Sequence, residues 1–139
     1  MGEADFVATG RCLCGAIRFG LKEKLAPVGF CHCSLCRRAS GVASNAVLNV
    51  RRDRFEWLAG EASVQTYATE TGWKSLFCRT CGSPAPHVLS GGDRVLVPAG
   101  LLDGDPDLVR SGHIFVGSKA RWEVIGDDAP QFDEWPPQG

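Results

Sequence analysis

The sequence predicts a single, mainly β domain built of short strands. Its 17 glycines and 8 prolines interrupt the apolar runs every few residues, and no stretch keeps the apolar repeat of a long amphipathic helix. The 7 cysteines fall into three close groups, a spacing typical of metal ligands. At 139 residues the chain fits one domain. We expect that domain to span 1–139, with a core over about 8–126 and an irregular C-terminal tail.

Short strands are expected where apolar and polar residues alternate between glycine or proline turns. These strands are residues 11–21, 43–50 and 73–77. Two further pairs of runs flank turn sequences and predict hairpins. The hairpins are 86–89 with 94–98, and 55–58 with 64–67. The first half of the chain contains one plausible helix, which follows Ser34 and ends near Gly41.

Charge and hydropathy argue against several classes of protein. Lys and Arg number 15 against 16 Asp and Glu, so the chain lacks the basic footprint of a nucleic-acid-binding protein. The first residues do not form a secretory signal, and Phe6 stands where myristoylation of Gly2 would require Ser or Thr. No apolar run approaches the ~20 residues of a membrane helix. We expect a soluble cytoplasmic protein whose thiols stay reduced.

Two cysteine pairs are spaced to share one structural ion. Residues two apart on an extended strand project from the same face, so Cys12 and Cys14 can bind one metal. In the knuckle Cys78-x-x-Cys81, a turn that ends at Gly82 brings two thiolates together. Closed structural zinc sites use four ligands. These four thiolates are therefore assigned to a structural zinc, which closes a loop of 64 residues (78 − 14).

The remaining cysteines, Cys31, Cys33 and Cys36, form a local three-thiolate set. Three protein ligands leave a fourth position for solvent or substrate, as in catalytic zinc sites. With three thiolates on a dication the formal charge is −1 (+2 − 3), so such a centre is poor at generating hydroxide. It is better suited to accept a soft thiolate. The set therefore favours sulfur chemistry over hydrolysis.

Other interpretations of the cysteines stay open. Both sites could be structural, with a histidine closing the second tetrahedron. The candidates for that role are His32, His87 and His113. His32 is the least suitable because it lies between two ligands and should point to the opposite face. A redox dithiol at Cys78 and Cys81 would need a βαβ context, which is absent.

Five segments resemble the glutathione-dependent formaldehyde-activating enzymes and the related centromere-protein-V domain. The segments are Gly10–Phe19, Cys31–Gly41, Phe77–Pro84, His113–Trp122 and Pro130–Phe132. The resemblance implies a β-tent fold similar to Mss4, a structural zinc on the flanking pairs and a second, looser zinc on the central three cysteines. It implies an activity that joins formaldehyde to glutathione, giving S-(hydroxymethyl)glutathione by a carbon–sulfur lyase reaction in reverse. It assigns no glutathione-contacting residues.

The expected partner is glutathione or another small thiol, and the oligomeric state stays open, a homodimer included. Arg37 and Arg38 are either surface charges or the cations that bind a carboxylate of that ligand. Side chains that could donate a hydrogen bond to a developing alkoxide also lie in these segments. They are His32, Ser34, Ser40 and Lys119, each of which also has a plausible structural role.

Three alternative functions were weighed against this enzyme. A non-catalytic zinc-containing carrier of glutathione or another thiol is the main one, because thiols and formaldehyde combine without help. A scaffold like the centromere-associated relatives would be expected to add a basic or proline-rich extension, which these residues do not contain. Methionine sulfoxide reduction needs a late redox cysteine, and none follows Cys81.

We predict two zinc ions per chain, with the four-thiolate ion the harder one to remove, because a closed tetrahedron holds its metal more strongly. Graded chelator treatment followed by metal analysis of the protein tests this order of release. A single ion bound jointly by Cys31, Cys33 and Cys78 would contradict the division into four and three.

Overall fold

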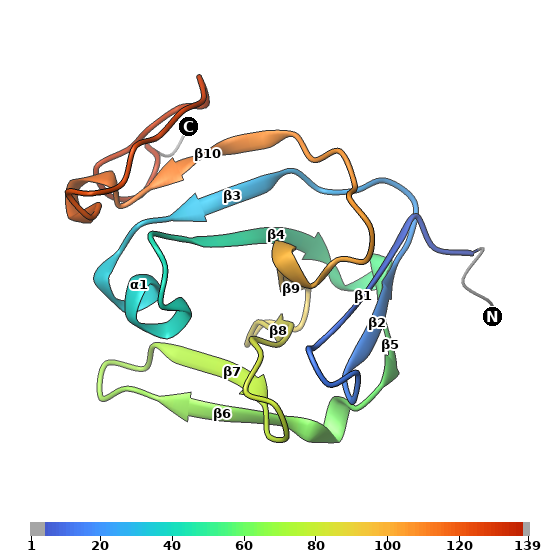
Figure 1. Cartoon of the computed structure of the whole chain (residues 1–139). Coiled ribbons are helices and arrows are strands. Elements are labelled where there is room, and N and C mark those ends of the chain that lie inside the picture. Colours follow the sequence, from blue (N-terminus) through green and yellow to red (C-terminus); the bar gives the residue numbers. More distant parts are fainter. Residues whose placement is uncertain (1–4, 138–139) are drawn as a thin grey trace.

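The computed structural model describes residues 5–137, in which ten short strands and one α-helix are arranged as three sheets (Figure 1). The five-stranded sheet has the order β10 (Arg110–Ile114), β3 (Val28–Cys31), β4 (Asn45–Arg51), β9 (Arg94–Pro98), β8 (His87–Val88). The three-stranded sheet consists of β1 (Ala8–Arg11), β2 (Arg18–Leu21) and β5 (Phe55–Ala59). The two-stranded sheet pairs β6 (Val64–Ala68) with β7 (Lys74–Cys78). The mainly β prediction is confirmed.

The three sheets enclose the middle of the molecule, and α1 (Ser34–Ser40) lies at one end (Figure 1). The β6–β7 pair lies on the opposite side of the molecule from β3 and β10, the three-stranded sheet lies at one end, and α1 lies at the other end. Neighbouring strands run antiparallel except β10 and β3, which are parallel. The helix that contains Cys36 and is capped by Cys33 therefore lies far from the three-stranded sheet.

The main core forms where β2, β3, β4, β5 and β9 meet. Its fully buried members include Leu48 of β4 and Val95 and Val97 of β9, whose alternate residues face inward. Phe19 and Phe55 stack with ring centroids 5.6 Å apart. A second, smaller core surrounds Ile17 and includes two of the cysteines as buried side chains. It consists of Cys12, Ile17, Cys78 and Ala85.

Several predicted elements are confirmed. The helix after Ser34 ends at Gly41, which adopts the left-handed φ of 75° that favours glycine. The 86–89 and 94–98 runs form the β8–β9 hairpin. The strands predicted at 43–50 and 73–77 are β4 and β7.

Two strand predictions were wrong. Residues 11–21 are not one strand, because a turn separates β1 from β2. The runs 55–58 and 64–67 are strands but not a hairpin, since β5 pairs with β2 and β6 pairs with β7. Gly60, at a φ of 78°, and the 3-10 turn Glu61–Ser63 redirect the chain from one sheet into the other.

The C-terminal segment lacks helix and strand up to residue 137, as predicted for the tail, yet it is hydrogen-bonded to β10 and its continuation. The N–H of His113 donates to the carbonyl of Pro130 (2.8 Å), and the N–H of Phe132 donates back to the carbonyl of His113 (2.9 Å). Across residues 5–137, no helix is long and apolar enough to cross a membrane. Gly2 lies outside the described residues.

We predict that Gly60→Ala lowers the melting temperature much more than Gly72→Ala. Both glycines have positive φ, so each alanine carries a backbone strain of about 1–2 kcal/mol. A Cβ at position 60 would also collide with the backbone carbonyl of Ala16, whereas a Cβ at position 72 would meet open space. Thermal melts followed by circular dichroism compare the two variants, and equal losses would contradict the close approach at Gly60.

Candidate metal centres

The structure brings the two flanking cysteine pairs together, as the sequence predicted for their positions. Cys12 and Cys14 follow β1, while Cys78 ends β7 and Cys81 lies in the next turn. All four Sγ atoms lie within 4.8 Å of one another. Cys12 and Cys78 are buried and Cys14 is exposed. The group thus joins two parts of the chain that are 64 residues apart (78 − 14).

The sulfur spacing of this group fits a tetrahedral ion. A tetrahedral zinc with Zn–S bonds of about 2.3 Å has sulfur–sulfur edges of roughly 3.8 Å. The Sγ atoms of Cys12 and Cys14 are 3.7 Å apart, and those of Cys14 and Cys78 are 3.8 Å apart. These two distances match that geometry, and the other sulfur pairs of the group lie within 4.8 Å.

The first pair reaches this geometry on a turn and not on the extended strand that the sequence predicted. The N–H of Gly15 donates to the carbonyl of Cys12 (3.1 Å), and Gly15 adopts a φ of 83°. The turn also aims backbone donors at sulfur: Ile17 N–H at Cys12 Sγ (3.3 Å) and Ala16 N–H at Cys14 Sγ (3.5 Å). Such bonds stabilise thiolates.

The second pair lies in the knuckle that the sequence predicted. The N–H of Gly82 donates to the carbonyl of Cys78 (2.8 Å), with Gly82 at a φ of 78°. Ser83 then joins the two turns, because its Oγ accepts the N–H of Leu13 (2.9 Å) and lies 3.3 Å from Cys81 Sγ. Ser83 is a contact between the cysteine pairs that sequence reasoning did not single out.

The three central cysteines form a second group at the start of α1. Cys31 ends β3, Cys33 caps the helix and Cys36 lies in its first turn, with all three Sγ atoms within 4.8 Å of one another. The N–H of Cys36 donates to Cys33 Sγ (3.3 Å), so this ligand also serves as the N-cap. Among residues 5–137, no histidine or carboxylate side chain joins this group as a fourth donor.

Crowding shifts the pKa values of these central thiols in opposite directions. A hydrogen bond from the Cys36 thiol lowers the pKa of Cys31 to about 6, in spite of partial burial. The same bond, together with burial and the nearby Cys31 charge, raises the pKa of Cys36. Without a cation the three thiols therefore resist carrying three negative charges, which a divalent ion would relieve.

The four-cysteine group shows the same competition. Hydrogen bonds from the Ser83 side chain and backbone lower the pKa of Cys81 to about 5. For Cys14 the backbone N–H of Ala16 favours the thiolate, but burial and the three neighbouring thiols raise the pKa to about 11. Both groups therefore have the donor set of a site for a thiophilic divalent cation, and their chemistry fits zinc.

The histidines that could have closed the second site lie elsewhere. His32 is 1% exposed, and its Nε2 lies 2.8 Å from Nδ1 of His113. His113 in turn lies 3.0 Å from the carboxylate of Asp127. His87 is on β8, and burial and the charge of Lys74 lower its pKa.

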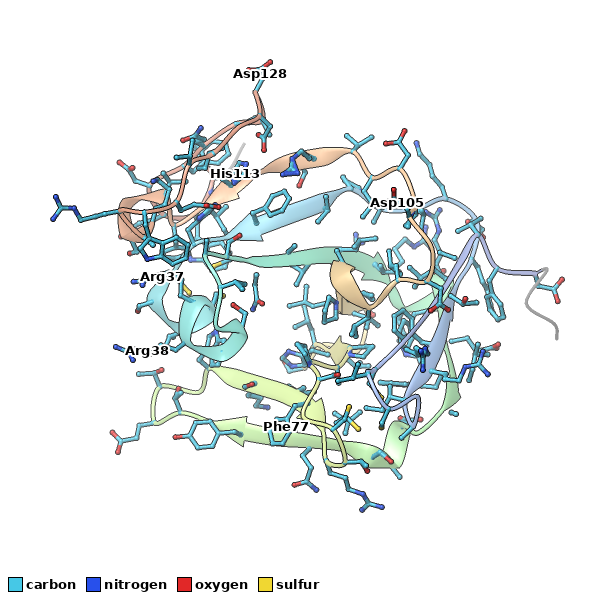
Figure 2. All side chains as sticks on the ribbon, viewed as in Figure 1. Arg37, Arg38, Phe77, Asp105, His113 and Asp128 are labelled. Atoms are coloured by element: carbon cyan, nitrogen blue, oxygen red, sulfur yellow. The ribbon has the colours of Figure 1, made fainter. Side chains whose placement is uncertain are left out.

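A pocket of about 240 Å³ lies at the C-terminal end of α1. Its lining consists of Arg37, Arg38, Gly41, Val42 and Trp122. Figure 2 shows Arg37 and Arg38 extending from α1 at the end of the molecule away from the three-stranded sheet. The Arg37 Nε is buried and has no hydrogen-bond partner within the described chain. Trp122, which is 70% exposed, was not predicted as part of a site.

Two of the other predicted donors are hydrogen-bonded to backbone carbonyls, and the third is exposed. The Ser40 hydroxyl donates to the carbonyl of Cys36 (2.8 Å). Lys119 Nζ donates to the carbonyl of Glu123 (2.6 Å). Ser34 is exposed at the start of α1.

Residues 7–118 match the family described as glutathione-dependent formaldehyde-activating enzyme, which covers most of the chain. The chain belongs to this family. The resemblance drawn from the cysteine segments is thereby confirmed, and the fold is consistent with the Mss4-like tent. The chain is also similar to a Rhodobacter sphaeroides protein of known crystal structure, at 25% identity and a TM-score of 0.56. That match covers 73% of this chain and 98% of the other.

We predict different outcomes for one serine substitution in each group. Cys78→Ser should unfold the protein or sharply lower its melting temperature, because structural zinc sites carry folding free energy. Cys33→Ser should leave a folded, inactive chain, since serine can keep the N-cap of α1 while losing the sulfur ligand. Melting temperature, zinc content and turnover of both variants test this, and equal thermal losses would show that the two groups do not differ in role.

Proposed function

We propose that this chain catalyses the addition of a small thiol to an aldehyde. Glutathione and formaldehyde are the simplest pair, which would make it an S-(hydroxymethyl)glutathione synthase-like enzyme of the carbon–sulfur lyase class. One observation carries the proposal: among residues 5–137 the three-thiol group of Cys31, Cys33 and Cys36 has no fourth histidine or carboxylate donor, and two arginines directly follow Cys36 on α1. Membership of a glutathione-dependent family agrees with this.

We assign a structural zinc to Cys12, Cys14, Cys78 and Cys81, and a second zinc to Cys31, Cys33 and Cys36. When bound at the three thiolates, zinc supplies an open coordination position that favours an incoming sulfur as thiolate. The formal charge of that centre is −1 (+2 − 3). Arg37 and Arg38 offset this charge for a ligand that is itself anionic.

The reaction balances without an oxidant, a reductant or a further substrate. The thiol sulfur forms a bond to the carbonyl carbon, the carbon–oxygen π bond breaks, and the thiol proton ends on the resulting hydroxyl. Because formaldehyde is already electrophilic, the protein needs mainly to hold and orient the nucleophile. The reverse reaction breaks the same carbon–sulfur bond, which is the lyase direction.

The chain's own residues position the thiol. The N-terminal turn of α1 holds Cys33 and Cys36 side by side, and the helix then presents Arg37 and Arg38 to the adjoining pocket. Glutathione carries two carboxylates, which guanidinium groups bind with directed hydrogen bonds. Arg37 lines this pocket, and its Nε has no hydrogen-bond partner among residues 5–137. Trp122 forms an apolar wall of the same pocket.

A larger pocket beside the four-cysteine group is a poorer site for this ligand. It has a volume of about 520 Å³ and lies over Cys12 and Leu13. Its rim contains Asp103, whose carboxylate accepts a hydrogen bond from Thr9 (2.7 Å), and its cation is Arg11. An acidic tripeptide is therefore better matched by the two arginines at α1.

We predict that the zinc-loaded protein accelerates S-(hydroxymethyl)glutathione formation above the spontaneous rate, as measured by exchange NMR at constant reactant concentrations. Arg37→Ala should raise KM for glutathione at least tenfold, because a charge-assisted contact is lost. Arg79→Ala is the matched control, since Arg79 is an exposed arginine beside the other cysteine group. It should change KM by less than twofold.

Two outcomes would contradict this proposal. Saturable glutathione binding with no acceleration would leave the protein a thiol carrier and not an enzyme. Equal KM values for Arg37→Ala and Arg79→Ala would remove the assigned carboxylate contact. S-methylglutathione serves as the ligand control, because it keeps both carboxylates but cannot supply a thiolate; it should bind weakly.

A further inference from the structure

A line of buried polar side chains connects the central cysteine group to the C-terminal segment. It begins at His32, which lies between Cys31 and Cys33, and passes through His113 to Asp127. His32 and His113 are 1% and 3% exposed. Asp127 lies beyond residue 118, where the match to the family ends. These contacts join imidazole and carboxylate groups and include none of the seven thiols assigned to metal.

We propose that Asp127, acting through His113 and His32, is a positioning residue for the loop that carries Cys31 and Cys33. The inference rests on the proposed function only in assigning a metal to the three central thiols. It makes the C-terminal segment part of that site and not a loose tail. Three observations carry it: the directions of the hydrogen bonds, the single polar anchor of the His32 ring, and the packing around His113.

The carboxylate of Asp127 determines which atoms donate and which accept along this line of side chains. Its oxygens accept the Arg110 Nε–H (2.9 Å) and the backbone N–H of Ala129 (2.9 Å). Partial burial opposes ionisation, but these donors, His113 and the Arg110 charge lower the pKa of Asp127 below its usual range. An ionised carboxylate only accepts hydrogen bonds. The Nε2 of His113, 3.0 and 3.1 Å from its two oxygens, must therefore carry a proton.

With a neutral His113 ring, that proton determines the tautomer of His32. In a neutral His113 protonated at Nε2, the Nδ1 atom can only accept. His32 Nε2, 2.8 Å away, must then donate its own proton to His113 Nδ1. The remaining ring nitrogen, His32 Nδ1, carries a lone pair and no proton. It is buried and has no hydrogen-bond partner among residues 5–137.

The His32 ring therefore has a single polar anchor, and that anchor is His113. Its main chain is attached to the same strand, because the N–H of His32 donates to the carbonyl of Ile114 (3.0 Å). Both attachments lie on β10, which pairs in parallel with β3 just before the central cysteines. A residue between two metal ligands transmits its position to both of them, as groups beyond the ligands do at many metal sites.

Packing fixes the central histidine of the line. The ring of His113 stacks on Phe30 with centroids 4.9 Å apart. The guanidinium of Arg110 lies over the same Phe30 ring, 4.5 Å from its centroid. The same Arg110 donates to Asp127, so the stack and the hydrogen bonds share a member. Backbone bonds from His113 to Pro130 and from Phe132 to His113 place the C-terminal segment alongside.

Asp128 provides a matched control. It is the next residue along the same segment and has the same side chain, but it is exposed, and Figure 2 shows it pointing away from the body of the molecule while His113 lies on β10. Asp127→Ala removes the end of the line, whereas Asp128→Ala removes an equal charge from the same region. Any difference between them cannot come from net charge.

The test uses full-length protein whose four-cysteine group is zinc-loaded and whose central group is titrated with Co²⁺ alone. Asp127→Ala should weaken Co²⁺ binding about tenfold or more, as is typical when the partners of ligand-bearing groups are removed. Asp128→Ala should change it less than twofold. The zinc content of the four-cysteine group should be the same in both variants. Equal Co²⁺ affinities for the two variants would overturn the proposal, whatever the result with glutathione and formaldehyde.

A second readout does not depend on metal affinity or turnover. Long-range ¹H–¹⁵N correlation spectra of histidine-labelled protein at pH 7.5 should show His32 as the pure Nε2–H tautomer in the wild type and in Asp128→Ala. Asp127→Ala should convert His32 to a mixture, because His113 can then place its proton on either nitrogen. A wild-type His32 protonated at Nδ1, or an unchanged tautomer in Asp127→Ala, would contradict the proposal. If Asp127→Ala does not fold, the tautomer of His32 in the wild-type spectrum alone tests the proposal.

Discussion

The four thiols of Cys12, Cys14, Cys78 and Cys81 connect the turn between β1 and β2 to the β6–β7 hairpin. That hairpin forms a sheet of only two strands, and such a sheet is marginally stable in water without further support. Its support comes from the thiol group and the small core around Ile17, in which Cys12 and Cys78 are buried. Four thiols this close cannot all ionise without a cation, so the structural zinc that we propose here would strengthen the join. The position of the β6–β7 pair, on the opposite side of the molecule from β3 and β10, therefore depends on these four thiols (Figure 1).

The central group has the same thiol donors with one fewer, and we propose that this difference separates a structural role from a reactive one. Cys31, Cys33 and Cys36 come from a strand end and one helical turn, so local structure brings their thiols together, and in our proposal His113 and Asp127 then hold the loop between the first two. The arginines of the next turn follow directly from the helical register. We propose that the substrate sulfur binds at the cysteines where α1 begins and that its carboxylates bind at the arginines near the end of this helix, while β10 and the segment beyond it hold His32 in place.

Much of this could be predicted from the sequence because cysteine spacing is local chemistry. The partition into four and three needed no fold, and Gly41 and Gly82 marked the end of the helix and the knuckle. The sequence prediction gave the wrong reason for the closeness of Cys12 and Cys14. They lie on a turn that depends on the positive φ of Gly15, and an alternation of apolar and polar residues does not reveal such a turn. β10 was missed because Arg110, Ser111 and Gly112 are poor strand signals, and it forms by pairing with β3. Asp127 could not have been found, because only the folded C-terminal segment brings it to His113.

The proposed function requires that the three-thiol group bind a metal with an open position that a substrate sulfur fills. X-ray absorption at the cobalt edge tests this most directly, using protein with zinc at the four-cysteine group and Co²⁺ at Cys31, Cys33 and Cys36. We expect about three sulfur neighbours around cobalt in the free protein and about four when glutathione is saturating. A sulfur count that does not change with glutathione, in protein shown to bind it, would contradict the claim and leave the central site structural.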